Sequence, residues 1–205
     1  MTALSTFKSA VVQFEPILSE TERNVSRLLA MVREAAQSGA RLIVTPEMAT
    51  TGYCWYDRSE VMPFVQAIPG PTTDRFGSVA KEFGCYIVVG MPEVDAGTDL
   101  YYNTAVLIGP QGVVGKHRKS HPYISEPKWA ASGDTHAVFD TEIGRIALLI
   151  CMDLHFFETA RLQALAGGEA VEGNSDAALR REIRSGYFDE FLESLAISRH
   201  VSSST

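Results

Sequence analysis

The sequence predicts an α/β fold in one domain, and two observations carry that prediction. Strand-like and helix-like segments alternate along residues 8–90, and this order favours parallel strands whose faces are covered by helices. The chain has 205 residues, of which 45% are hydrophobic and 21% are charged. That length supports one substantial core rather than two large domains, so we expect residues 1–205 to form a single domain.

The first strand and the first helix follow from the spacing of apolar residues. The segment KSAVVQFEP, which begins at Lys8, is typical of a strand, and Gly39 precedes a second apolar strand, RLIV, at 41–44. Between these strands, apolar residues recur at the spacing of one helical face, at Val25, Leu28, Leu29, Val32 and Ala36. The sequence therefore predicts a strand, a helix that ends at Gly39 and a second strand.

A second helix and strand repeat this order. The helix begins near Thr73, after the turn-forming residues PGP, and Gly84 closes it before the apolar strand CYIVVG at 85–90. The next segment, NTAVLIGPQGVVGKH, predicts a hairpin of two strands that turns at 109–112. A loop rich in polar and aromatic residues then covers 119–134, and loops of this kind often carry functional groups.

The last predicted strand leads into a segment of different character. The strand RIALLI at 145–150 is almost wholly apolar, which predicts burial on both faces, and a helix is expected from about 156 to 166. From about residue 169 the chain is charged, and its spaced apolar residues predict an atypical helical tail. This tail lacks the apolar run that would add a strand beside RIALLI. Its polar face is rich in Glu and Asp, so we expect it to contact protein rather than a membrane.

Composition argues against several classes of partner. The formal net charge is −7, whereas nucleic acids and anionic membranes attract clusters of Lys and Arg. The three cysteines, Cys54, Cys85 and Cys151, form no CxxC pair, so neither a disulfide framework nor a zinc ribbon is predicted. No apolar run has the length of a membrane span, and no typical secretory signal is present. We therefore expect a cytoplasmic protein that acts on a small molecule or binds a protein.

Three chemically distinct side chains follow three of the predicted strands. Glu47 follows RLIV, Lys119 follows VVGKHR, and Cys151 follows RIALLI. Because the ends of adjacent strands converge in an open parallel sheet, these side chains could meet in one crevice. Together they offer a base, a fixed positive charge and a nucleophile, which acyl transfer needs. Singly, the two charged residues are typical of a solvated surface, and a free cysteine is typical of a buried core.

The position of Cys151 also bears on its acidity. It stands where a buried strand ends and a helix is expected to begin. Backbone N–H groups at the start of a helix favour an anion, so the sequence predicts a lowered pKa for this thiol.

No cofactor or metal is predicted. His117 and His121 have i, i+4 spacing, but Pro122 and a strand-like context argue against a helix, and neither an HExxH motif nor paired cysteines accompany them. The sequence also contains no GxSxG, GxGxxG or phosphate-binding loop motif.

Three segments, TPEMATTGY, KHRKSH and LLICMDLHFFETAR, together resemble the signature segments of the nitrilase superfamily of carbon-nitrogen hydrolases. The resemblance covers residues 8 to about 168. It implies Glu47 as the general base, Lys119 as the catalytic lysine and Cys151 as the nucleophile. It also suggests Glu126 as a second glutamate near the lysine, although a surface role for this loop residue stays open.

The resemblance implies a fold as well as a site. Members of the superfamily form an α-β-β-α sandwich, in which two sheets lie between two layers of helices. They normally have several more strands after the cysteine segment than this sequence predicts. We therefore expect a nitrilase-like sandwich whose C-terminal part can be incomplete, and a homo-oligomer, as is common in the superfamily.

The residues after the cysteine bear on the substrate. The triplet CMD at 151–153 resembles the amidase-like branch, which implies cleavage of a small amide or carbamoyl compound through a cysteine acyl-enzyme, with release of ammonia or an amine. Tyr53, Trp129, Met152 and His155 flank the three signature residues and are expected to contact the substrate, Met152 through its backbone N–H. Two alternatives stay open: a true nitrilase that acts on a nitrile, and a shortened, non-catalytic homologue that acts as an interaction protein.

Overall fold

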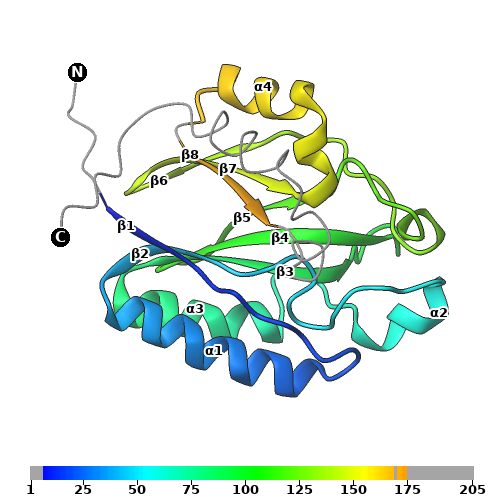
Figure 1. Ribbon diagram of the computed structural model, residues 1–205, viewed down its shortest axis with the longest axis horizontal. Helices are drawn as coiled ribbons and strands as arrows, with labels where there is room; N and C mark the ends of the chain where they lie inside the picture. The colour runs from blue at the N-terminus through cyan, green and yellow to red at the C-terminus, as the bar shows by residue number, and fades with distance from the viewer. Residues whose placement is uncertain (1–6, 169, 175–205) are drawn as a thin grey trace, which may run out of the picture.

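The structure, a computed structural model, describes residues 7–168 and 170–174. These residues form four layers, in which two β-sheets pack face to face between two layers of helices (Figure 1). This arrangement confirms the predicted α-β-β-α sandwich. None of the helices in the described ranges combines the length and the apolar character that a membrane span requires.

The first sheet has five strands in the order β1-β2-β3-β4-β5. The first three strands are parallel, and β4 and β5 are each antiparallel to the strand before them. The predicted parallel unit and the predicted hairpin are thus both confirmed. The strands are β1 (Lys8–Val11), β2 (Ala40–Val44), β3 (Tyr86–Val94), β4 (Tyr101–Gly109) and β5 (Gly112–Arg118).

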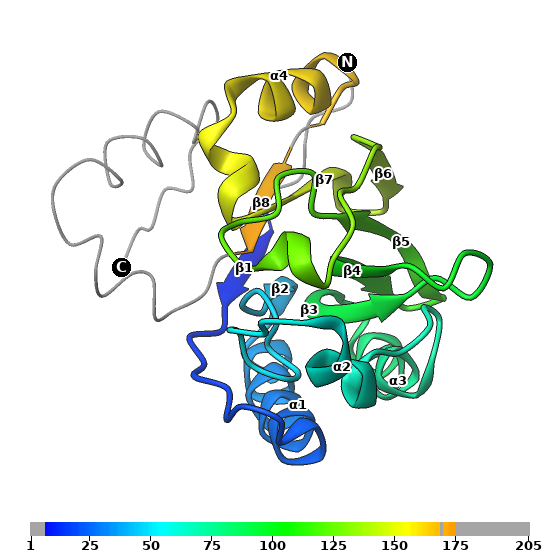
Figure 2. The same ribbon diagram turned by 90° about the vertical axis from the view of Figure 1, so that its right-hand side faces the viewer.

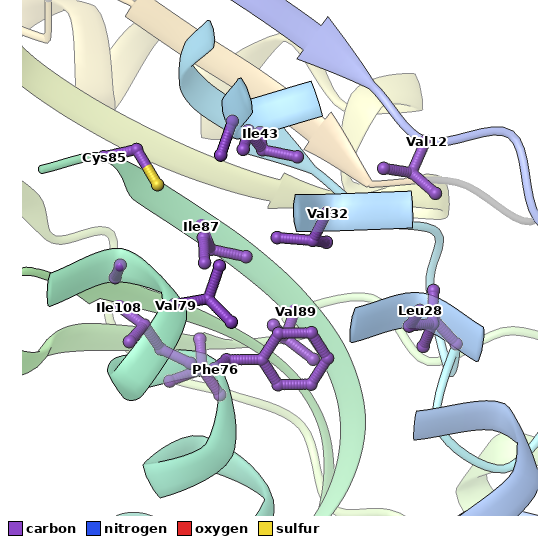
Figure 3. Packing of buried hydrophobic residues seen from close by; sticks show 14 of the residues in the cluster. Val12, Leu28, Val32, Ile43, Phe76, Val79, Cys85, Ile87, Val89 and Ile108 are labelled. Atoms are coloured by element: carbon purple, nitrogen blue, oxygen red, sulfur yellow. The ribbon is translucent and has the colours of Figure 1, made fainter. Parts of the chain in front are cut away.

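Two helices, α1 (Thr21–Gln37) and α3 (Pro71–Phe83), cover the outer face of this sheet. The apolar stripe of α1 is buried as its spacing predicts, and Gly84 ends α3 in the left-handed region at φ 61°, where glycine carries no steric penalty. Apolar side chains of both helices and the sheet interdigitate in the core between them (Figure 3). Two short helices, α2 (Arg58–Val61) and η1 (Met62–Phe64), precede α3.

The second sheet has three strands in the order β6-β7-β8, namely β6 (Val138–Thr141), β7 (Gly144–Ile150) and β8 (Ala170–Asn174). After β7 the chain forms a 3-10 helix, η3 (Cys151–His155), and then α4 (Phe157–Leu165). Figure 2 shows α4 on the side of this sheet that faces away from α1 and α3. The apolar strand RIALLI is buried on both faces, as predicted.

The strand β8 corrects one prediction. The sequence predicted a helical tail from about residue 169 and no further strand, but residues Ala170–Asn174 pair in parallel with β7. A strand is held to its neighbour by backbone hydrogen bonds, so the segment AVEGN can pair although it lacks the long apolar run of RIALLI. The part of the predicted helical tail after residue 174 lies outside the described residues, and the single domain spanning 1–205 stays a prediction.

Candidate active site

The inner faces of the two sheets form one buried apolar core, and the candidate site lies at one end of it. This core includes Leu42 and Val44 of β2, Leu148 and Ile150 of β7, and Cys151 itself. Because Cys151 packs with side chains of both sheets, the interface between the sheets determines where the thiol lies. The site is therefore built across two sheets.

Three strand ends deliver the three predicted side chains. Glu47 lies three residues after β2, Lys119 follows β5 directly, and Cys151 follows β7 directly. The convergence that the sequence predicted is present, but its predicted reason was wrong. Cys151 comes from the second sheet, and β2 and β5 are separated by β3 and β4 in the first. Packing of one sheet on the other, and not adjacency within one sheet, brings the thiol to the two charged groups.

A closed ring of hydrogen bonds joins Glu47, Lys119, Glu126 and Asn103. The ammonium Nζ of Lys119 lies 2.7 Å from Oε1 of Glu47 and 2.6 Å from Oε2 of Glu126. The amide Nδ2 of Asn103 lies 2.6 Å from Oε1 of Glu47 and 2.6 Å from Oε1 of Glu126. The charged side chains are each 1% exposed. Such burial is costly unless charges are paired and hydrogen-bonded, which this ring provides.

The backbone holds Lys119 on both sides. Its N–H donates to the carbonyl oxygen of Asn103 at 2.8 Å, and its own carbonyl oxygen accepts from the N–H of Gly133 at 2.8 Å. A Cβ atom added to Gly133 would lie 2.0 Å from the carbonyl oxygen of Arg118, which is an impossible contact. Glycine is therefore needed at this position to hold the end of β5 in place.

Glu126, which the sequence placed in a loop, begins the short 3-10 helix η2 (Glu126–Lys128). Its Oε2 accepts from Lys119 and from the backbone N–H of Tyr123 at 2.6 Å, and its Oε1 accepts from Asn103. A surface role is thereby overturned. Because both oxygens are engaged by donors, Glu126 fits the role of a fixed negative charge beside Lys119.

Cys151 adopts a strained conformation that turns its side chain out of the strand. Its φ is 42°, in the left-handed region that residues with a Cβ seldom occupy, and it is 7% exposed. Burial raises the pKa of its thiol, the negative charge of Glu47 raises it further, and Lys119 lowers it.

The predicted lowering of the Cys151 pKa was therefore wrong. The prediction rested on a helix beginning at this residue, whereas α4 begins only at Phe157. Burial and a neighbouring carboxylate raise the thiol pKa more than the backbone N–H groups of the short η3 can lower it, so the side chain of Cys151 is a neutral thiol before reaction.

Burial and neighbouring charges act in opposite directions on the pKa values of Glu47 and Lys119. Burial raises the pKa of Glu47 to about 7, although Lys119 partly opposes this effect. Burial alone would lower the pKa of Lys119, but the carboxylates of Glu47 and Glu126 hold it above its ordinary value. Near neutral pH the site thus contains a permanent cation and a carboxylate that can either take up or release a proton.

The four predicted substrate contacts have different surroundings. The ring of Tyr53 lies 5.6 Å from Nζ of Lys119, and burial together with the charges of Glu47 and Glu126 raises its pKa. Trp129 is buried in the apolar cluster that Tyr53 packs against. Met152 is half-buried beside Cys151, whereas His155 is exposed. Substrate contact stays a prediction for all four residues.

Sequence reasoning missed Asn103, although a signal was available. Asn103 lies near the start of β4, and the antiparallel pairing of β4 with β5 brings the start of one strand to the end of the other. In the predicted hairpin, residues equidistant from the turn face each other, and Thr104 indeed pairs with Arg118. If the starts of the strands had been considered along with their ends, the hairpin would have predicted a polar residue, Asn103, beside Lys119.

The second residue that was missed, Asp153, connects the two sides of the site. Its buried carboxylate accepts from the backbone N–H groups of Ser120 and His121 after β5, and from that of Ile150 at the end of β7. It also bonds the rings of His117 and His121, at 2.8 Å and 3.0 Å. Asp153 thus ties the turn that carries Cys151 to the segment that carries Lys119.

We expect Asp153→Ala to destabilise the fold by about 3 kcal/mol or more, because several buried donors lose their acceptor. Burial raises the pKa of Asp153, but its hydrogen bonds with the two histidines outweigh burial and hold it below the ordinary value. Its stabilisation is therefore present above the unfolded-state pKa of about 3.9 and is lost as pH falls further. Urea denaturation at pH 7 measures the change.

The control for this prediction is Asp140→Ala. The side chain of Asp140 is 83% exposed and bonds Arg145 at the surface, so its loss should change stability by less than about 0.5 kcal/mol. Equal effects of the two substitutions would show that Asp153 does not connect the two segments.

The four-layer fold defines an α-β-β-α sandwich protein, and a buried thiol, carboxylate and ammonium group lie where its two sheets pack together. The sequence profile described as carbon-nitrogen hydrolase matches residues 8–181. The chain belongs to the carbon-nitrogen hydrolase family.

Relatives of known name support the assignment. The chain is 40% identical over 166 residues to a protein of Pyrococcus abyssi named nitrilase, with 80% of this chain and 63% of that protein covered. It is 34% identical over 175 residues to the omega-amidase NIT2 of Mus musculus, with 80% and 61% covered. The chain therefore spans less than two thirds of the length of these relatives.

Solved structures share the fold. Saccharomyces cerevisiae Nit3, a member of branch 10 of the nitrilase superfamily, matches with a TM-score of 0.80 at 24% identity, covering 93% of this chain and 71% of that chain. An amidase from Nesterenkonia sp. matches with a TM-score of 0.71 at 22% identity, covering 84% and 65%. At these identities the likeness concerns the fold alone.

Proposed function

We propose that this protein hydrolyses a non-peptide carbon–nitrogen bond of a small amide or carbamoyl compound through an acyl-enzyme on Cys151. The observation that carries the proposal is the burial of a thiol, a carboxylate whose pKa is about 7 and an ammonium group in one site. Membership of the carbon-nitrogen hydrolase family supports this reaction class. The relatives named omega-amidase support an amide substrate.

In the first step, the thiol sulfur of Cys151 attacks the substrate carbonyl carbon while Glu47 takes the thiol proton. Because the thiol pKa is raised, the proton leaves during the attack rather than before it. The electron pair of the carbonyl moves to its oxygen. An ammonium group has three hydrogens, of which Lys119 uses two on Glu47 and Glu126, so the third can stabilise the oxyanion together with the N–H of Met152.

In the second step, Glu47 returns the proton to the leaving nitrogen, the carbon–nitrogen bond breaks, and ammonia or an amine departs. A thioester on Cys151 remains. Glu47 then takes a proton from water as the water attacks the thioester. The carbon–sulfur bond breaks, Glu47 returns its proton to the sulfur of Cys151, and the acid is released. The same carboxylate thus acts as base and then as acid in each half of the reaction, which a pKa of about 7 permits near neutral pH.

The remaining expectations belong to the same proposal. Tyr53, Trp129 and His155 contact the substrate, and Met152 does so through its backbone N–H. The reaction uses no cofactor and no metal. We place the protein in the cytoplasm as a homo-oligomer.

Two other functions are tested beside this one. The relative with 40% identity is named nitrilase, which favours a nitrile substrate at the same residues. The other is a non-catalytic homologue that binds a protein.

Ammonia release from a panel of small amides, carbamoyl compounds and nitriles separates the three functions. We expect turnover of amides or carbamoyl compounds and little turnover of nitriles. Preferred turnover of nitriles would support the nitrilase, and no turnover across the panel would support the interaction protein.

We expect Glu47→Gln to lower kcat by about 10²–10⁴-fold, because glutamine cannot accept the thiol proton. In the wild type, kcat/KM should rise with pH around a midpoint near 7 as Glu47 ionises. This rise should be absent from the residual activity of the variant. Stability should change little at pH 7, since the wild-type carboxyl is already protonated in part.

Glu82→Gln is the control for this substitution. Glu82 is half exposed and pairs with Arg33 on the surface, remote from the ring. Its replacement should leave both kcat and the midpoint unchanged, and a midpoint near 7 that survives in Glu47→Gln would assign it to another group.

A further inference from the structure

The two oxygens of Glu47 have unequal surroundings. Both donors in the ring, Nζ of Lys119 at 2.7 Å and Nδ2 of Asn103 at 2.6 Å, bond the same oxygen, Oε1. Neither bonds Oε2. The charge of the same carboxylate raises the pKa of the Cys151 thiol, so the two groups interact. An oxygen that already accepts two hydrogen bonds is a weaker base than its partner, so the two oxygens are suited to different tasks.

The orientation of the Asn103 amide follows from its neighbours. Ionised carboxylates only accept hydrogen bonds, so the amide must present Nδ2, and not its oxygen, to Glu47 and Glu126. Both amide hydrogens are thereby used. Within the described part of the chain, the buried Oδ1 of Asn103 has no hydrogen-bond partner, which is a cost. The side-chain amide is therefore held by the two carboxylates alone.

We propose that Asn103 is a positioning residue, which together with Lys119 holds Oε1 of Glu47 so that Oε2 faces Cys151 and carries the proton. This inference rests on the proposed function, because it assigns the atoms of the proposed base. In the step concerned, the S–H bond of Cys151 breaks, an O–H bond forms at Oε2, and the sulfur electron pair forms the new bond to carbon. Asn103 does not itself touch the substrate.

The position of Asn103 on β4 lets its side chain reach both Glu47 and Glu126. It lies on β4, between β3 and β5, so its side chain reaches the carboxylate that arrives after β2 and the one in η2. Lys119 bridges the same two carboxylates from the end of β5. Because Lys119 and Asn103 both bridge the two carboxylates, neither carboxylate can rotate. With one bridge alone, the carboxylate of Glu47 could rotate and interchange the positions of its two oxygens.

The test is the pH dependence of Cys151 alkylation by iodoacetamide, followed by peptide mass analysis, together with kcat/KM on an accepted substrate. In the wild type, both rates should rise around a midpoint near 7 as Glu47 ionises. The bond from Asn103 favours the ionised form of Glu47, so Asn103→Leu should raise both midpoints by roughly one pH unit. At pH values above the midpoint, kcat should still fall about tenfold or more with KM unchanged, because the base is misoriented.

Two further variants keep the test decisive. Asn103→Asp preserves the shape of the side chain and serves if the leucine variant does not fold. It should raise both midpoints more than Asn103→Leu does, because it adds a third carboxyl group. Gln163→Met is the matched control. Gln163 is also a buried amide with an unpartnered oxygen, but it donates to the backbone of Leu148, so its loss should leave both midpoints unchanged.

The possible outcomes separate this inference from the proposed function. Midpoints that do not move in either Asn103 variant, or no midpoint near 7 in wild-type alkylation, would overturn the inference. Alkylation midpoints that move as expected without turnover of any substrate would support the inference and refute the hydrolase. A shift of equal size in Gln163→Met would reduce Asn103 to a structural role.

Discussion

Replacement of Cys151 by alanine is expected to lower turnover by about 10⁴-fold or more, because the proposed acyl intermediate forms on its sulfur. The fold should survive. Alanine removes one sulfur atom from a site that is 7% exposed, which costs about 1–2 kcal/mol. Ammonia release and urea denaturation measured on the same preparation separate the loss of chemistry from the loss of structure.

Cys85→Ala supplies the matched control for this substitution. Cys85 is fully buried in the core between the first sheet and its helices (Figure 3) and has no part in the ring. Its replacement creates a similar cavity, so stability should fall by a similar amount while turnover stays at the wild-type level. Turnover that persists in Cys151→Ala would remove Cys151 from the role of nucleophile.

Lys119→Met is expected to have the largest combined effect. It leaves the carboxylates of Glu47 and Glu126, each 1% exposed, without their shared cation, which should destabilise the fold by about 3–5 kcal/mol near neutral pH. Activity should fall by about 10²–10³-fold or more, because the oxyanion loses its charged donor. Equilibrium unfolding in urea and the rate of ammonia release measure the two effects.

The pH dependence of this destabilisation identifies its cause. Lys119 opposes the rise in the pKa of Glu47 that burial causes, so in the variant this pKa lies further above its unfolded value of about 4.3, and the destabilisation is small below that pH. It grows as pH rises and the folded carboxyl group of Glu47 must ionise. The difference in stability between wild type and Lys119→Met should therefore be larger at pH 8 than at pH 5. A difference that does not depend on pH would indicate lost packing instead of unpaired charge.

Lys116→Met is the control for the loss of a lysine that pairs with a buried carboxylate. Lys116 pairs with the buried carboxylate of Glu93, but its own side chain is 31% exposed and Arg118 bonds the same carboxylate. Loss of Lys116 leaves Glu93 paired, so the destabilisation should be clearly smaller and turnover should be unaffected. A loss of stability equal to that of Lys119→Met would contradict the special position of Lys119.

Much of the fold was predictable because its signals are local. The burial of α1, the turn between β4 and β5 and the double burial of β7 each follow from the spacing of apolar residues or from glycine positions. The strand β8 was not predictable in this way. Its place beside β7 depends on backbone hydrogen bonds to a strand about twenty residues earlier, which leave no mark in its own sequence.

The candidate site was predictable in part for the same reason. Glu47, Lys119 and Cys151 stand at strand ends that can be located along the chain, and their order matches the signature segments of one superfamily. Asn103 and Asp153 were missed because they act through residues distant in sequence. Asn103 bonds a carboxylate 56 residues away, and Asp153 bonds the ring of a histidine 36 residues away.

The sequence by itself determined the family, the alternation of strands and helices and the three reactive side chains, since composition and spacing are properties of the chain alone. Only the tertiary structure decided how these side chains act on each other. Packing of the second sheet on the first brings Cys151 to Glu47 and removes both from water. Burial then raises the pKa of the thiol and of the carboxyl group, which reverses the acidity that the strand end alone suggested for Cys151, because a charge loses its hydration in the low-dielectric interior.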